Sequence, residues 1–213
     1  MILSIILGIV VLVFSAILHE VAHGYVADRL GDPTARLMGR LTLNPIPHID
    51  PFLSIALPLL LVLTGSPVIF GGAKPVPVDP YNLREGRKDL ALVSMAGPLT
   101  NVLLAVVASL LLHITQAIPA FTGSAANFIT FLLMTIVQYN ILLAIFNLLP
   151  IPPLDGSKIF SLVLPEREAA AYMSLGQIGM IILFVLLAFP LGGFSLEGLI
   201  THLYALAIHL LGF

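Results

Sequence analysis

Two histidines and a glutamate stand together at the end of a long apolar run. The run covers Ile2–Leu18, and His19, Glu20 and His23 follow it directly. A helix places positions i and i+4 on one face, so His19 and His23 could hold a single zinc ion. Glu20 between them could act as general base toward water at that zinc. Ionisable groups at membrane depth are costly, so this pattern predicts a zinc hydrolase whose site lies inside the bilayer, rather than a chance match on a helix end.

A catalytic zinc usually has three protein ligands, so a third one is needed. Asp155 is the best candidate, because it lies in a Pro-Pro-Leu-Asp-Gly turn directly after an apolar stretch. Asp-Gly is also a common turn pair, and a plain turn residue is the alternative interpretation. Asn147, eight residues earlier, could donate its amide to a substrate carbonyl or oxyanion, although helix capping or interhelical hydrogen bonding would also explain it. The candidate catalytic residues are therefore Glu20 and Asn147, and the candidate ligands of one zinc ion per chain are His19, His23 and Asp155.

The composition is that of a membrane protein. Hydrophobic residues make up 59% of the 213 residues and charged residues only 9%, with a mean hydropathy of +1.08, whereas soluble domains carry about 25% charged residues. The net charge of −2 leaves no basic footprint, so we expect no nucleic-acid partner. There is no cysteine, which excludes thiolate catalysis and leaves His, Asp and Glu as metal ligands. We expect residues 1–213 to form a single domain embedded in the lipid bilayer.

Several apolar stretches are long enough to span a bilayer, although the last two are short: Ile2–Val26, Leu90–Ile114, Phe128–Leu149, Leu175–Leu191 and Leu196–Leu211. A sixth stretch, Pro51–Phe70, is interrupted by proline and glycine. If it dips into the bilayer and returns, all nine Lys and Arg fall on one side, which the positive-inside rule assigns to the cytoplasm. We therefore expect a re-entrant segment, an outside N-terminus, five crossings and a cytoplasmic C-terminus. If Pro51–Phe70 crossed the bilayer fully, the chain would have six crossings, and Asp155 and His19 would lie on opposite faces of the membrane.

The expected fold class is an α-helical integral membrane protein with about five to six transmembrane helices, a re-entrant segment and a short β-sheet near the active site. The sheet would use residues 35–43, which alternate imperfectly, and residues 73–78, which are expected to be extended. Pro75 and Pro77 remove ladder donors and suit an edge strand. The three motifs at residues 19–24, 96–101 and 147–156 all converge on the cytoplasmic half of the membrane in this topology.

Together these motifs make the chain resemble the site-2 protease family of intramembrane zinc metalloproteases. They are His19-Glu20-x-x-His23-Gly24, Ala96-Gly97-Pro98-x-x-Asn101 and Asn147-Leu-Leu-Pro150-x-x-Pro153-Leu-Asp155-Gly156, and the resemblance covers nearly the whole chain. It implies that His19, His23 and Asp155 bind zinc, that Glu20 is the catalytic base and that Asn147 lies near the substrate. It also implies a metalloprotease of a prokaryotic cell membrane, which cuts transmembrane segments of partner proteins and releases signalling fragments.

The chain departs from the family pattern in two respects. Ser157-Lys158 stands where many members have Gly-Arg after the Asp-Gly pair, and this form is expected to be compact, without a PDZ or CBS domain. The rival interpretations are a transporter or ion channel that uses the charged cluster as an ion path, and an inactive relative that binds membrane proteins without cutting them. The sequence leaves open the oligomeric state, whether Asn101 does more than pack in its span, and whether His48 is more than a loop residue.

Overall fold

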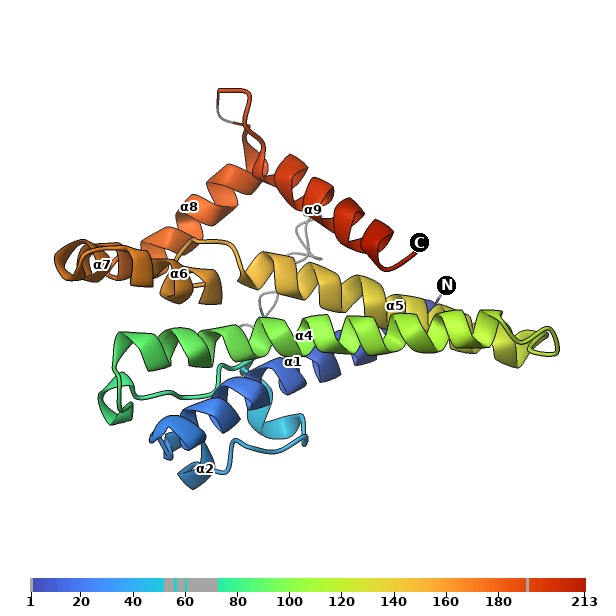
Figure 1. Cartoon of the computed structure of the whole chain (residues 1–213), viewed down its shortest axis with the longest axis horizontal. Helices are drawn as coiled ribbons and strands as arrows, with labels where there is room; N and C mark the ends of the chain where they lie inside the picture. Colours follow the sequence, from blue (N-terminus) through green and yellow to red (C-terminus); the bar gives the residue numbers. More distant parts are fainter. Residues whose placement is uncertain (1, 52–55, 57–59, 61–72, 191) are drawn as a thin grey trace.

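The computed structural model describes residues 2–51, 56, 60, 73–190 and 192–213, and its long elements are helices (Figure 1). Helices α1 (Ile2–Leu30), α4 (Arg87–Gln116) and α5 (Ser124–Asn147) are long and apolar enough to cross a membrane. At about 1.5 Å per residue each exceeds the roughly 30 Å of a hydrocarbon core. The protein is therefore an α-helical integral membrane protein.

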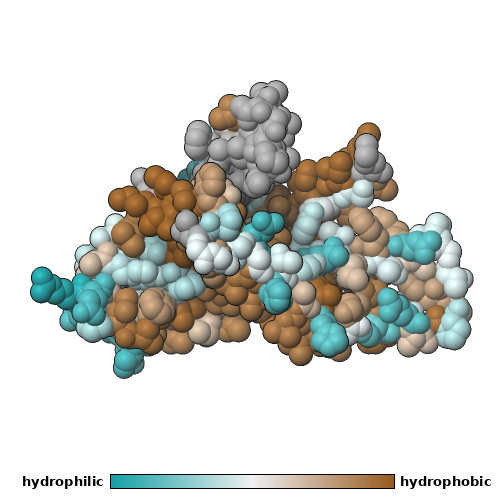
Figure 2. Space-filling view, turned by 90° about the horizontal axis from the view of Figure 1, so that it is seen from above, coloured by the Kyte–Doolittle hydropathy of each residue, from teal (hydrophilic) through white to brown (hydrophobic). Residues whose placement is uncertain are grey.

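Helix α4 packs along both α1 and α5, which also touch each other. The α4–α5 contact buries small residues of α4 against branched residues of α5, and its buried members are Ala105, Ala108, Leu112, Leu133, Val137 and Ile141. Small side chains let two helix backbones approach closely where lipid provides no hydrophobic drive for association. The outward faces stay apolar: Ile2, Leu3 and Ile5 of α1 are exposed, and brown apolar surface covers much of the face in Figure 2.

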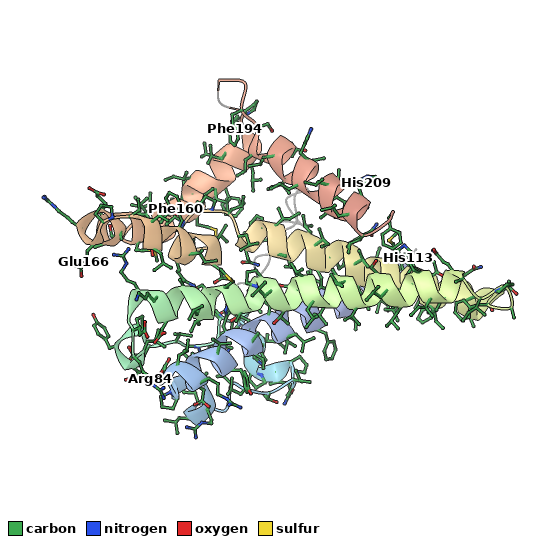
Figure 3. The ribbon with its side chains drawn as sticks, viewed as in Figure 1. Arg84, His113, Phe160, Glu166, Phe194 and His209 are labelled. Atoms are coloured by element: carbon green, nitrogen blue, oxygen red, sulfur yellow. The ribbon has the colours of Figure 1, made fainter. Side chains whose placement is uncertain are left out.

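Short elements connect the long helices. Between α1 and α4 lie α2 (Thr34–Leu37), η1 (Ile46–His48) and η3 (Pro80–Asn82). After α5 come α6 (Asp155–Phe160), η4 (Ser161–Val163) and α7 (Glu166–Met173). The end of α1, the start of α4 and α7 gather at one end of the molecule, where Figure 3 also places Arg84 and Glu166. We call this the basic end, because the segments that gather there carry Arg29, Arg87, Lys88 and Arg167, and Arg84 lies beside them.

The last two helices return to the opposite end. Helices α8 (Gly176–Ala188) and α9 (Leu196–Leu210) form an inverted V in Figure 1. Ser109 Oγ, late in α4, donates a 3.1 Å hydrogen bond to the Leu211 carbonyl, and the rings of His113 and Phe213 lie 4.8 Å apart. Both termini therefore lie at the end opposite the basic end (Figure 1). The side of the membrane on which the C-terminus lies stays a prediction.

The described residues contain fewer candidate spans than the expected five to six. In the described residues, three helices meet the length and hydropathy expected of a span, and a fourth span is possible if the pair Glu166–Met173 and Ile178–Ala188, bent by 73°, counts as one. The physical reason is length: α8 has 13 residues and α9 has 15, so at about 1.5 Å per residue neither reaches across roughly 30 Å alone.

The predicted sheet is absent from the part of the chain that the structure describes. Residues 73–79, which we call the strap, belong to no helix or strand. Proline lacks an N–H and favours extended backbone in the residue before it, so Pro75 and Pro77 keep the strap extended but deprive it of ladder donors. The N–H groups of Lys74, Val76 and Asp79 bind the His48 carbonyl and the Glu20 and Asp32 carboxylates instead of a second strand.

Most of Pro51–Phe70 lies outside the described residues, but its flanks are described and meet. The Lys74 N–H donates a 2.8 Å hydrogen bond to the His48 carbonyl. The chain therefore leaves and re-enters the described structure at one place, which agrees with the expectation that both flanks share one side of the membrane.

Candidate metal centre

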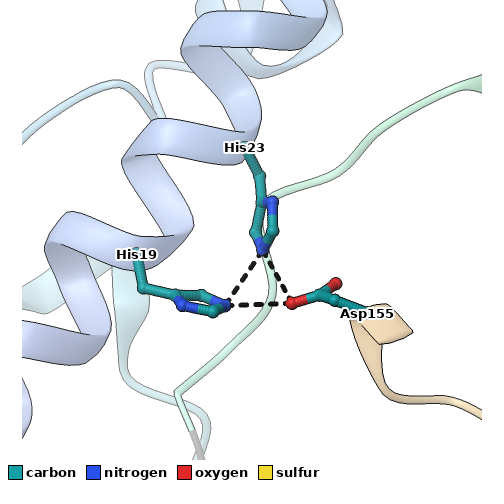
Figure 4. Close-up of side chains that lie close together, drawn as sticks. All are labelled: His19, His23 and Asp155. Atoms are coloured by element: carbon teal, nitrogen blue, oxygen red, sulfur yellow. Dashed lines mark hydrogen bonds and ion pairs between the residues drawn. The ribbon is translucent and has the colours of Figure 1, made fainter. Parts of the chain in front are cut away.

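His19, His23 and Asp155 meet at one point in the bundle (Figure 4). His19 Nε2 lies 3.0 Å from His23 Nε2, and each of these nitrogens lies 3.1 Å from Asp155 Oδ2. All three residues are buried. The two histidines come from one face of α1, one helical turn apart, and the aspartate is the first residue of α6.

Two features hold Asp155 in place. A side chain at Gly156 would collide with the Leu148 carbonyl, so only glycine lets the start of α6 lie against the end of α5. On the far side of α6, Arg87 at the start of α4 donates through Nη2 to the carbonyls of Ser161 and Leu164, the latter at 2.9 Å. Helix α6, which begins with Asp155, is therefore held against the end of α5 at its start and to α4 just beyond its end.

Gly97 of α4 forms the wall beside the ligand atoms. A Cβ built on Gly97 would lie 2.5 Å from both His19 Nε2 and His23 Nε2. The backbone of α4 thus approaches the two ligand nitrogens as closely as it can, and a side chain there would fill the space in front of them. Close helix packing explains Gly97 only in part, because its missing side chain leaves room at the centre.

The outward-facing atoms of the three residues are also bonded. His23 Nδ1 donates to the Val93 carbonyl at 2.7 Å, so its Nε2 presents a lone pair toward Asp155. His19 Nδ1 lies 2.5 Å from Asn101 Oδ1. Lys158 Nζ donates to Asp155 Oδ1 at 3.1 Å, which leaves Oδ2 directed at the histidines. Such outer contacts orient metal ligands in known sites.

These residues fit a zinc ion. Two imidazole nitrogens and one carboxylate oxygen are a set that zinc takes in hydrolases, with the fourth position left for water or substrate. The three atoms converge from two elements, and Gly97 keeps the adjacent space clear. In the described residues this is the group of His, Asp and Glu whose ligand atoms converge closely enough to share a metal ion.

Comparison with known proteins agrees with this geometry. The sequence model of peptidase family M50 matches residues 7–127 and 111–190. The chain belongs to peptidase family M50. It is thus a zinc metallopeptidase of the site-2 protease family, and the resemblance noted from its motifs is confirmed.

Bacterial relatives of this M50 protein cover most of the chain. The chain is 38% identical over 193 residues to "Putative zinc metalloprotease YwhC" of Bacillus subtilis. The matched region spans 88% of this chain and 83% of that protein. It is 36% and 34% identical over 180 residues to proteins named "Putative zinc metalloprotease Rip2" from Mycolicibacterium smegmatis and Mycobacterium tuberculosis H37Rv. Those matches span 83% of this chain but only 64% of the Rip2 proteins. No solved structure matches the chain significantly.

The two predicted catalytic side chains of this M50 protein stand apart from the three ligand atoms. Glu20, half-buried on α1, accepts a 2.7 Å hydrogen bond from the Val76 N–H of the strap through Oε2. Asn147, half-buried at the last residue of α5, donates its Nδ2 to the Leu143 carbonyl of its own helix at 3.0 Å. The structure thus brings Glu20 to the strap, and it bonds Asn147 within its own helix rather than to another helix.

Sequence reasoning left open or missed several groups around the centre. Asn101, whose role beyond packing it left open, contacts His19 directly. Its signal was available, since a wholly buried amide in an apolar helix needs a partner. His48 is buried and its Nε2 lies 2.9 Å from the Thr42 carbonyl, so the loop interpretation of that residue is supported. The backbone groups of Val76 and Val93 carry no sequence signal.

Proposed function

We propose that this protein is an intramembrane zinc metalloprotease that hydrolyses peptide bonds within transmembrane segments of partner proteins. The observation that carries the proposal is the convergence of His19 Nε2, His23 Nε2 and Asp155 Oδ2 within 3.0–3.1 Å, between apolar helices. We assign these three as the zinc ligands and Glu20 as the base. Residues 1–213 would form one membrane-embedded catalytic domain.

The chemistry follows from the residue types. Zinc supplies Lewis acidity when bound, lowering the pKa of water to about 7 and polarising a carbonyl. Glu20 takes a proton from the attacking water and passes it to the leaving amine. Its Oε2 is occupied by the Val76 N–H, so Oε1 is the oxygen left for proton transfer. Asn147 would contribute to oxyanion binding once its amide turns from the Leu143 carbonyl toward the substrate.

The substrate must be unwound where it is cut, because a helix hides its carbonyls in its own hydrogen bonds. An extended peptide could pair with the strap only through backbone N–H and carbonyl groups that are not already hydrogen-bonded. The N–H groups of Lys74 and Val76 are already bonded to His48 and Glu20, and positions 75 and 77 are prolines. Pairing along residues 74–77 of the strap would therefore use carbonyls or would compete with Glu20 for the Val76 N–H.

We propose that the site faces the cytoplasm. The ligand cluster joins the late part of α1, the early part of α4 and the start of α6, which all lead to the basic end of the molecule. The positive-inside rule places such an end in the cytoplasm. Because the chain has no cysteine, the variants Lys88→Cys and Thr122→Cys each carry one thiol. An impermeant maleimide applied to intact cells should label position 122 and spare position 88; the reverse pattern would overturn this orientation.

The function is tested by zinc content and cleavage measured together. Protein purified in detergent without chelator should hold about one zinc per chain and cut a model transmembrane substrate. Asp155→Ala should lose both zinc and cleavage. Glu20→Gln should keep zinc and lose at least ~100-fold in cleavage rate, as expected when a general base is removed. Cleavage by the folded Glu20→Gln variant at the wild-type rate, or wild-type protein without zinc, would reject the proposal.

A further inference from the structure

A chain of polar side chains crosses the apolar bundle from α5 to the metal centre. Asn101 Nδ2 donates to Asn140 Oδ1 at 2.8 Å. Asn140 Nδ2 donates in turn to Ser15 Oγ and to the Ile136 carbonyl, each at 2.9 Å. At the other end, Asn101 Oδ1 lies 2.5 Å from His19 Nδ1. The two amides are 0% exposed, so water cannot replace any of these partners.

The chain has a fixed direction. The Ile136 carbonyl can only accept, so it holds the Nδ2 end of Asn140 and turns Oδ1 toward α4. That oxygen can also only accept, so Asn101 must present Nδ2 to it and Oδ1 to His19. His19 Nδ1 then has to carry its proton, which leaves the lone pair of the ring on Nε2.

We propose that Asn101 and Asn140 are positioning residues that fix the tautomer and ring orientation of His19 for zinc. The anchor of this relay is the backbone carbonyl of Ile136 on α5, two amides away from the imidazole. The inference rests on the proposed function, because it takes His19 as a zinc ligand. Neither asparagine touches the metal or the substrate; each acts through His19 Nδ1.

The second histidine shows why a relay is needed. His23 Nδ1 reaches a carbonyl of α4 directly, that of Val93. His19 lies one turn earlier on α1 and faces Asn101 of α4. The hydroxyl of the preceding residue, Thr100, bonds the Ala96 carbonyl of its own helix. For His19, the side-chain oxygen of Asn101 is the acceptor, in the place that a backbone carbonyl takes for His23. An amide can rotate by half a turn, which would put N–H groups against His19; Asn140 prevents that rotation.

Metal affinity tests the relay with matched variants. Asn101→Leu keeps the branched heavy-atom skeleton but has no acceptor, and it should weaken zinc binding by about 10–100-fold, as loss of an outer partner of a ligand histidine does. Asn101→Asp keeps an oxygen for the Nδ1 proton and should bind zinc much more tightly than Asn101→Leu. Asn140→Leu should cause a smaller loss, because Asn101 is then present but free to turn. Thr135→Val is the control, since Thr135 is a buried hydroxyl that bonds only its own helix at Phe131.

The readouts are the zinc dissociation constant by chelator competition and the visible absorption of the cobalt-substituted protein. We expect the cobalt spectrum to change in Asn101→Leu and to match wild type in Thr135→Val. The proposal is overturned if folded Asn101→Leu keeps the affinity and spectrum of wild type, or if Asn101→Asp loses as much affinity as Asn101→Leu. Should Asn101→Leu not fold, a wild-type affinity in Asn140→Leu decides against it. Wild-type protein that binds no zinc would instead reject the proposed function.

Discussion

The backbone N–H of Val76 donates a 2.7 Å hydrogen bond to Oε2 of Glu20. The strap therefore holds one oxygen of the proposed base and leaves the other for proton transfer. The strap itself is fixed at both ends. Arg40 Nη2 donates to the Lys74 carbonyl at 2.8 Å, and the Asp79 N–H donates to Asp32 Oδ2 at 2.7 Å. The orientation of Glu20 thus depends on backbone far from it in the sequence.

Val76→Pro removes this donor without changing the charge of any residue. The residue lies between Pro75 and Pro77, and proline disfavours helical backbone in the residue before it. Hydrogen bonds to charged groups contribute about 1.5–3 kcal/mol, so we expect kcat to fall about tenfold or more. Zinc content should stay at the wild-type level, since no ligand is touched. Steady-state cleavage of a transmembrane substrate and elemental analysis provide the two measurements.

Two controls separate the N–H from the side chain. Val76→Ala keeps the donor and loses only packing, so its kcat should lie well above that of Val76→Pro. Val78→Pro removes an N–H that has no partner among the described residues and should leave kcat near wild type. Equal kcat values in Val76→Pro and Val76→Ala would show that the hydrogen bond does not orient the base.

Gly97→Ala tests the space in front of the ligand nitrogens. The added Cβ would lie 2.5 Å from Nε2 of both His19 and His23, so the imidazoles or α4 must shift. Overpacking of this kind costs about 1–3 kcal/mol, and we expect zinc affinity to fall at least ~10-fold together with cleavage. Isothermal titration with zinc in detergent would measure the change.

Gly198→Ala is the matched control for that substitution. A Cβ at this glycine of α9 would make only ordinary contacts with Ser195, at 3.4 and 3.5 Å. The change should leave zinc affinity unaltered and could stabilise α9, since alanine favours helix by up to about 1 kcal/mol over glycine. Unaltered zinc affinity in Gly97→Ala would mean that the centre has room that the structure does not show.

How far the sequence predicts this protein depends on the range of each interaction. His19 and His23 follow from a spacing of four on one helix, and the three long spans follow from hydropathy over local windows. Asp155 needed the Pro-Pro-Leu-Asp-Gly turn and is 132 residues from His23, yet the motif identified it. The described residues contain fewer candidate spans than expected, because hydropathy does not say what a short apolar helix packs against. Ser109 and His113 decide that point in the structure.

Asn101 and Val76 show which contacts of the site the sequence alone does not predict. A buried asparagine in a span predicts some polar partner, but only the packing of α1, α4 and α5 shows that the partner is His19. The donor at Val76 is a backbone N–H, and every residue except proline has one. The residue type therefore does not predict this hydrogen bond. Side-chain chemistry was predictable from the sequence, whereas its orientation by the surrounding backbone was not.

Arg87→Ala tests the support of Asp155 from α4. The guanidinium binds two carbonyls of the turn after α6, those of Ser161 and Leu164. Without it the turn is free to move, so we expect zinc affinity to fall by a few-fold to tenfold and thermal stability to decrease, as for loss of hydrogen bonds from a charged donor. Arg167→Ala removes an exposed arginine at the same end of the molecule and should change neither quantity. If both variants behave alike, the effect is one of charge and not of the tether.

Asp32 gives the strap a dependence on pH. Its buried carboxylate accepts from the Thr34 hydroxyl and N–H, the Asp79 N–H and Asn82 Nδ2. Burial raises the pKa of Asp32, but these hydrogen bonds together lower it by more. The net pKa therefore lies below its ordinary value of 3.8. The stabilisation from a carboxylate with a lowered pKa is complete above that ordinary value and is lost as the pH falls through the folded value.

Asp32→Asn should therefore reduce stability near neutral pH and lose less on acidification. We expect the free energy of unfolding to drop by about 1–3 kcal/mol at pH 7, because the amide cannot accept all four donors. Melting curves in detergent from pH 7 to pH 3 should show the gap between wild type and Asp32→Asn narrowing below about pH 4, as the pH falls toward the lowered pKa of the folded carboxylate. Glu166→Gln, which changes an exposed carboxylate of α7, serves as control. A constant gap between wild type and Asp32→Asn over the whole range would show that the ionised carboxylate does not stabilise the strap.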